Sequence, residues 1–152
     1  MQGYKSGVKA FYQGLTILFI FSMFLLCPKI SSAATINAAS CSASAVQAAI
    51  NSASDGDTVS VPAGSCTWSS KIPLNKKISI IGAGMDNTII TGHGFNVANG
   101  TNNWRISGFT FSSSSVSLAI QVGASRSSIG CRNFRIDNNK FIGYGAWIQV
   151  DG

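Results

Sequence analysis

Arg135, Asp137 and Lys140 have the residue types and the spacing best suited to chemistry. In "FRIDNNKF" Arg135 and Asp137 flank Ile136, so both should lie on the outer face of a strand whose Ile136 faces inward, and Lys140 follows the next turn. β-Elimination of a uronate uses a base together with cations or calcium that neutralise the uronate carboxylate, so an outward Arg, Asp and Lys group has suitable chemistry. An ordinary solvated ion pair is the simpler interpretation, and we favour it.

Arg105 falls in the same column as Arg135 when "WRISGFTF" is written above "FRIDNNKF". The two arginines would then form a short basic ladder suited to an acidic glycan. The tryptophans could stack on sugars, but Trp104 lies in the inward column and core packing is the favoured role. Neither Trp68 nor Trp147 can be assigned a face from the sequence.

His93 and the acidic turn Asp55-Gly56-Asp57 are the other candidates for a catalytic or metal site. His93 lies between two glycines, and no catalytic partner is legible nearby, so we expect an exposed loop histidine. The two aspartates would need further oxygen ligands, including a bidentate Glu, to form an EF-hand calcium loop, and the chain downstream of Ala34 has no Glu. We therefore expect a turn in which they accept bonds from nearby backbone N–H groups.

An internal repeat positions these side chains. Segments "ISIIGAGM", "WRISGFTF" and "FRIDNNKF" start at Ile78, Trp104 and Phe134, which gives a period of roughly 26–30 residues. They share an apolar first column, an isoleucine two positions later on the same strand face, a turn column of Gly or Asn, and a large apolar last residue (Met85, Phe111, Phe141). "IQVG" at 120–123 is echoed by "IQVDG" at 148–152.

Short strands in units of this length, with no helix between them, predict a parallel β-solenoid, while a sandwich of hairpins is the alternative. Before the repeat, Val46, Ala49 and Ile50 have the spacing of one apolar helix face, and Ser44 is the expected N-cap. Such a helix would cover the interior of the first coil.

The segments "AVQAAINSASDGDTVSVPAGSCTW" and "ISIIGAGMDNTIITG" resemble the N-terminal cap and opening coils of the pectate lyase superfamily. The resemblance extends from about Ala45 to Gly152 and implies an all-β fold, a right-handed parallel β-helix with a short N-terminal capping helix. It identifies an activity poorly, because the superfamily contains lyases, hydrolases, epimerases and non-catalytic surface proteins. No motif here matches the metal ligands or the catalytic base of its lyases.

The segment from Met1 to Ala34 has the pattern of a signal peptide. Lys5 and Lys9 precede an uncharged apolar run, "LTILFIFSMFLLC", and small residues follow it. The run, from Leu15 to Cys27, is short for a membrane span, which needs roughly 20 residues. We expect cleavage after Ala34, export to the cell surface, the medium or a periplasm, and no membrane attachment of the mature domain, residues 35–152.

The number of cysteines and the net charge of the chain after the signal-like segment are compatible with an exported protein. In an oxidising compartment a disulfide between Cys41 and Cys66 would pin the start of the fold, which leaves Cys131 as a free thiol, an intermolecular link or a cysteine whose partner is missing. Without the three lysines of the signal-like segment, eight basic residues face five acidic ones, a net charge of +3. That excess is too small for nucleic-acid binding, but it suits an acidic partner.

Two functions remain open. The leading one is a polysaccharide lyase or hydrolase acting on an acidic glycan, whose catalytic coils would lie beyond Gly152 and could use calcium. The second is a non-catalytic glycan-binding or adhesive solenoid. Because "WIQVDG" ends within a coil without a polar closing element, we expect the chain to be the N-terminal part of a longer protein.

Overall fold

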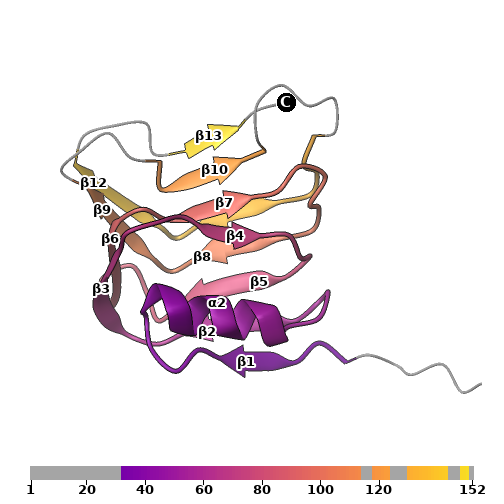
Figure 1. The fold of residues 1–152 in the computed structure, drawn as a ribbon, viewed down its shortest axis with the longest axis horizontal. Helices are drawn as coiled ribbons and strands as arrows, with labels where there is room; N and C mark the ends of the chain where they lie inside the picture. Colours follow the sequence, from indigo (N-terminus) through magenta and orange to yellow (C-terminus); the bar gives the residue numbers. More distant parts are fainter. Residues whose placement is uncertain (1–31, 114–117, 124–129, 144–147, 151–152) are drawn as a thin grey trace, which may run out of the picture. The chain divides into compact units, whose positions relative to one another are not determined.

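The computed structural model describes residues 32–113, 118–123, 130–143 and 148–150. Trp147 and most of the expected signal peptide fall outside the described residues. Among those described, thirteen short strands form three parallel sheets, and one helix precedes most of them in the chain (Figure 1). The chain divides into two units, residues 1–32 and 33–152, and the described helix and strands all lie in the second.

Successive strands along the chain enter the three sheets in turn. The first sheet contains β1 (Thr35–Asn37), β2 (Thr58–Val61), β5 (Ser79–Gly82), β8 (Arg105–Ser107) and β11 (Arg135–Asp137). The second contains β3 (Gly64–Trp68), β6 (Thr88–Gly92), β9 (Thr110–Ser113) and β12 (Lys140–Gly143). The third contains β4 (Ile72–Leu74), β7 (Phe95–Val97), β10 (Ile120–Val122) and β13 (Ile148–Val150).

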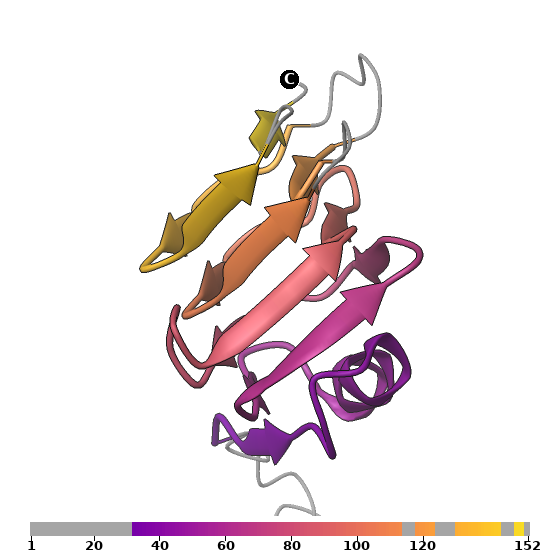
Figure 2. The same ribbon diagram turned by 90° about the vertical axis from the view of Figure 1, so that its left-hand side faces the viewer.

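Each coil therefore stacks on the coil before it, as Figure 2 shows for the second sheet, whose strands lie side by side facing the viewer. Every pairing within the sheets is parallel, and Ile120 pairs with Ile148 as the echoed "IQV" predicted. The predicted fold, a parallel β-helix with a short N-terminal helix, is confirmed, and the hairpin sandwich is excluded.

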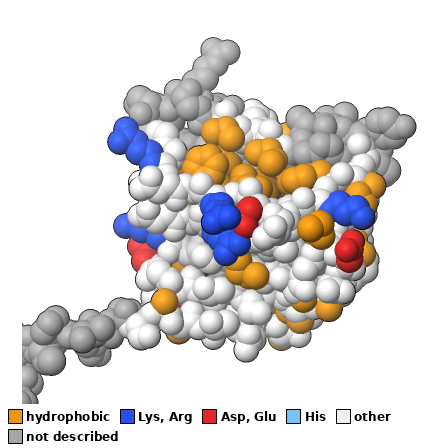
Figure 3. All heavy atoms as spheres, turned by 180° about the vertical axis from the view of Figure 1, so that it is seen from behind, with side chains coloured by type: hydrophobic (Ala, Val, Ile, Leu, Met, Phe, Trp, Pro, Cys, Tyr) orange, Lys and Arg blue, Asp and Glu red, His pale blue; other side chains and the backbone are white. Residues whose placement is uncertain are grey.

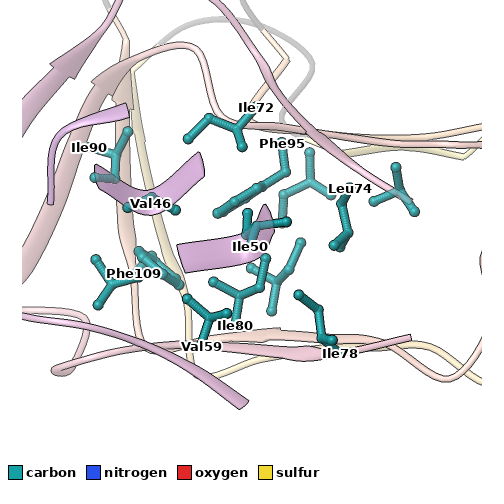
Figure 4. Packing of buried hydrophobic residues seen from close by; sticks show 14 of the residues in the cluster. Val46, Ile50, Val59, Ile72, Leu74, Ile78, Ile80, Ile90, Phe95 and Phe109 are labelled. Atoms are coloured by element: carbon teal, nitrogen blue, oxygen red, sulfur yellow. The ribbon is translucent and has the colours of Figure 1, made fainter. Parts of the chain in front are cut away.

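Inward columns of apolar side chains make the core. Val59, Ile80, Ile106 and Ile136 are in register on the first sheet, and the first three are fully buried. Full burial of an aliphatic side chain contributes about 1.5–3 kcal/mol, so these columns are the main stabilising element. Figure 4 shows Val59, Ile80 and Ile78 facing Phe95 and Leu74 across the interior.

Helix α2 (Ala43–Ser52) covers the first coil. As predicted, its buried face is Val46, Ala49 and Ile50. The N-cap prediction was wrong by two positions, because Ser42, not Ser44, has the extended backbone of a cap and accepts a bond from the backbone N–H of Ala45.

Two tethers hold this helix at both ends. The predicted disulfide between Cys41 and Cys66 is present, with a Cα–Cα distance of 5.8 Å. At the other end the Lys76 ammonium donates to the carbonyl groups of Ile50, Asn51 and Ala53 at 2.6–2.9 Å, which pairs carbonyls that the helix terminus leaves free. Cys131 is a half-buried free thiol.

The turn after β5 breaks the gapless alignment of the repeat. Phe111 stacks on Phe141 as expected, but it pairs with Ile90 and not with Met85, whose side chain is 39% exposed. The chain between β5 and β6 is longer than its counterpart between β8 and β9, and Met85 lies in this longer turn. The expectation for Met85 was therefore wrong.

The Gly and Asn turn column does mark the corners. Gly108 and Asn138 both have positive φ, 82° and 51°. Position 82 requires glycine because two coils lie close together there, and not because of its φ. A Cβ at this position would lie 2.3 Å from the Gly108 carbonyl oxygen.

Candidate functional site

The outer face of the first sheet carries the candidate site. Ser79, Arg105 and Arg135 form one outward column, and Ser107 and Asp137 share another two positions further along β8 and β11. Because residues alternate between faces along a strand, the inward positions between them are isoleucines, which hold both strands on the core.

A cross-coil ion pair links two of these side chains. Arg105 Nε donates to Asp137 Oδ1 at 2.7 Å, and Arg105 Nη2 donates to Asp137 Oδ2 at 2.6 Å. The side chain of Asp137 is 17% exposed and that of Arg105 is 38% exposed. A two-bond, partly shielded pair of this kind is stronger and more directional than ordinary surface pairs.

Arg135 adds a second positive charge to the same carboxylate. Its Nε lies 3.5 Å from Asp137 Oδ1, while 71% of its side chain is exposed. Two guanidinium groups therefore face one carboxylate, which leaves the cluster with a net charge of +1. In Figure 3 a group of basic side chains around one acidic side chain lies near the middle of the visible face.

The electrostatics of Asp137 oppose a role as a base. The hydrogen bonds from Arg105 lower the pKa of Asp137, the charges of Arg105 and Arg135 lower it further, and partial burial opposes them. The same contact raises the pKa of Arg105. A general base works best with a pKa near the operating pH, so this carboxylate is a weak proton acceptor at neutral pH.

Lys140 lies on a different sheet from its two predicted partners. It begins β12 of the second sheet, and its ammonium is 3.6 Å from Asp86 Oδ1 in a pair whose side chains are 51% and 81% exposed. The structure therefore brings Arg135 and Asp137 together with Arg105 and places Lys140 with Asp86.

The two described tryptophans belong to the core, and His93 lies in a less exposed place than expected. Trp104 is 2% exposed, as expected for core, and Trp68, which had no assigned face, is 1% exposed with its indole N–H donating to the Cys41 carbonyl. His93 is half-buried rather than exposed, and its backbone N–H donates to the Trp68 carbonyl.

Asp55 and Asp57 lie in a turn and accept hydrogen bonds from backbone N–H groups, as predicted. Gly56 has a positive φ of 95°, Asp57 accepts from the backbone N–H groups of Ala34 and Ser54, and Asp55 accepts from that of Lys77. Within the described ranges, no cluster of three or more His, Cys, Asp or Glu side chains could hold a metal ion.

A polar face on the third sheet was missed by the sequence reasoning. Asn96, Gln121 and Gln149 are in register along β7, β10 and β13, and the Lys71 ammonium donates to Gln121 Oε1 at 2.7 Å. The repeated "IQV" already aligned the two glutamines, but a glutamine between two apolar residues indicates only an outward position, not a role.

No protein-family model matches this chain, and no curated protein matches it. In the part of the chain that the structure describes, no helix has the length and apolar character needed to cross a membrane.

Proposed function

We propose that this chain is an exported β-solenoid protein, related to the pectate lyase superfamily, that binds an acidic polysaccharide through the outer face of its first sheet. The observation that carries the proposal is the guanidinium of Arg135, which is 71% exposed and lies in the same column as Arg105. An arginine fork can donate two parallel bonds to a uronate carboxylate.

Asp137 serves in this proposal as a positioning group. It holds Arg105 through two short bonds and lies 3.5 Å from Arg135, so it aligns both guanidinium groups along adjacent coils. Neighbouring strands of a sheet are about 4.8 Å apart, so the ladder presents cations at a fixed separation. The net positive charge favours an anionic chain over a neutral one.

Export is supported by the signal-like leader and by the disulfide between Cys41 and Cys66. Disulfides form and persist in oxidising compartments outside the cytosol. Extracellular polysaccharides are found in the same compartments. The cell surface, the medium and a periplasm all satisfy this part of the proposal.

Affinity electrophoresis through gels containing polyuronate tests binding. Arg135→Gln should weaken retardation about 3- to 10-fold at low salt, since a charge-assisted contact is lost. Lys77→Gln, which removes the same charge from the exposed pair with Asp55, is the matched control and should change little. Equal losses in both variants, or no retardation of the unmodified protein, would refute the assigned face.

Cleavage of the same polysaccharide is the alternative, because arginine and aspartate side chains gather on one outer face. Polyuronate should be incubated with the protein, with and without calcium, while ultraviolet absorbance follows unsaturated products. Because the contacts with Arg105 lower the pKa of Asp137, we expect no product from this cluster. Product that disappears in Asp137→Asn would make the cluster catalytic and replace the binding proposal.

A further inference from the structure

The carboxylate of Asp57 ties the start of the folded chain to the turn after helix α2. Asp57 is 6% exposed. Its Oδ1 accepts from the Ala34 backbone N–H at 2.8 Å, and its Oδ2 accepts from that of Ser54 at 2.7 Å. The Ala34 carbonyl in turn accepts from the Thr58 N–H at 2.8 Å, so both backbone groups of Ala34 are bonded.

The residues just before β1 offer two equivalent positions for removal of a leader. A leader peptidase requires small residues at positions −3 and −1 of the cut. Ser31 and Ala33 satisfy this for a cut after Ala33, and Ser32 and Ala34 satisfy it for a cut after Ala34. Residue types alone do not choose between them.

The hydrogen bonds of Ala34 distinguish the folded products of the two cuts. A cut after Ala34 removes its N–H and its carbonyl, which takes away one of the two backbone donors to the buried Asp57 and the partner of the Thr58 N–H. The buried Asp57 would then keep only the Ser54 donor, and the half-buried Thr58 N–H would lose its protein partner, and both losses destabilise the fold. A cut after Ala33 keeps both bonds.

We propose that the leader is removed by hydrolysis of the Ala33–Ala34 peptide bond and that the new α-ammonium group of Ala34 forms an ion pair with Asp57. Water adds across the bond, so Ala33 leaves as a carboxylate and the Ala34 nitrogen becomes the ammonium. The nitrogen keeps its present position and its bond to Oδ1. This inference rests on the export part of the proposed function and not on polysaccharide binding.

The surroundings suit such a pair. Ala34 itself is exposed, so the other two ammonium hydrogens can reach water. Hydrogen bonds from Ala34 and Ser54, and then the charge of Lys76, lower the pKa of Asp57 against the effect of burial, so the carboxylate is ionised. Lys76 donates its own bonds to three helix carbonyls, and the Ala34 ammonium would supply the direct positive partner.

The mass of the exported protein tests the cut. The full chain is produced in a secreting host, and the intact mass of the exported product is measured. We expect a chain beginning at Ala34, heavier by one alanine residue than a chain beginning at Thr35. A product that begins at Thr35, or one that retains the leader, would overturn the inference.

Labelling of the N-terminal amine tests the ion pair. An opposite charge within hydrogen-bond distance favours the protonated amine, so an acylating reagent at neutral pH should label Asp57→Asn about tenfold faster than the unmodified protein. Asp55→Asn is the control on the same turn, because Asp55 bonds Lys77 instead. Equal labelling of all three proteins would overturn the ion pair.

If the Asp57→Asn variant is not exported, the ion pair can still be tested on the unmodified protein. Its N-terminal amine is labelled in native buffer and in denaturant at the same pH. Slower labelling in the folded state supports the pair, and equal rates contradict it.

Discussion

The coils that contain β8 and β11 place the same kinds of side chain in the same columns, yet the two coils differ in burial. Ile106 is fully buried, whereas Ile136 is only half-buried. On the outer face, the Arg105 side chain is 38% exposed and bonded to the next coil, whereas that of Arg135 is 71% exposed.

The difference shows that the alternation of residues along a strand determines whether a side chain points inward or outward. How far that side chain is buried depends on the neighbouring coils. β8 has a strand on either side, β5 and β11, whereas β11 has β8 as its strand neighbour among the described residues. In a solenoid each coil contacts only adjacent coils, so stability is set locally by those neighbours. An identical substitution in the two coils should therefore have unequal effects.

The largest effect is expected from truncating the inward isoleucines. Ile106→Ala should lower the free energy of unfolding by about 2–5 kcal/mol, because a cavity opens in a fully packed column. Ile136→Ala removes the same atoms from a half-buried site and should cost about 1 kcal/mol. Urea unfolding monitored by circular dichroism measures both, and equal losses would contradict the dependence on neighbouring coils.

The cysteines give a second contrast between the ends of the described chain. Replacing Cys41 and Cys66 by Ser should cost about 2–4 kcal/mol, because the bridge restricts the unfolded chain across 25 residues. Cys131→Ser, just before β11, removes a half-buried free thiol and should change stability by about 0.5 kcal/mol. The comparison fails if Cys131→Ser shifts the thermal midpoint as far as the double replacement does.

Acid should release the cross-coil ion pair. The folded pKa of Asp137 lies below its unfolded value, which is about 3.9, so its stabilisation is complete above that pH and is lost as pH falls through the folded pKa. Asp137→Asn should flatten the acid limb of a plot of stability against pH. Asp86→Asn, in the exposed pair with Lys140, should leave that limb nearly unchanged.

The smallest effect on stability is expected at Arg135. Arg135→Gln should change the free energy of unfolding by about 0.5 kcal/mol or less, since the side chain is 71% exposed. Arg105→Gln should lower the thermal midpoint more, because Asp137 then loses both of its short bonds. Reversal of this order in differential scanning fluorimetry would mean that Arg135, not Arg105, secures the pair.

Most of the fold is readable in the sequence because the solenoid repeats its inward columns. Ile80, Ile106 and Ile136 fell in one column, and Val46, Ala49 and Ile50 fell on one helix face, since burial imposes these periods on apolar residues.

Turn lengths and contacts between coils were harder to predict from the sequence than the inward columns. The extra residues around Met85 lie in a turn, where no apolar period reveals an insertion. The column of Arg105 and Arg135 was predicted, but the choice of Arg105 as the two-bond partner of Asp137 depends on rotamers that spacing does not encode. Lys140 looked near in sequence, yet the corner at Asn138 carries it to another sheet.

Calorimetric titration with a short oligouronide and with its methyl ester tests the central claim most directly, namely that the arginine column recognises carboxylate groups. The account predicts saturable binding of the acid form that weakens as salt rises, and loss of that binding on esterification. Equal binding of the two forms, or no binding of the acid form at low salt, would contradict it.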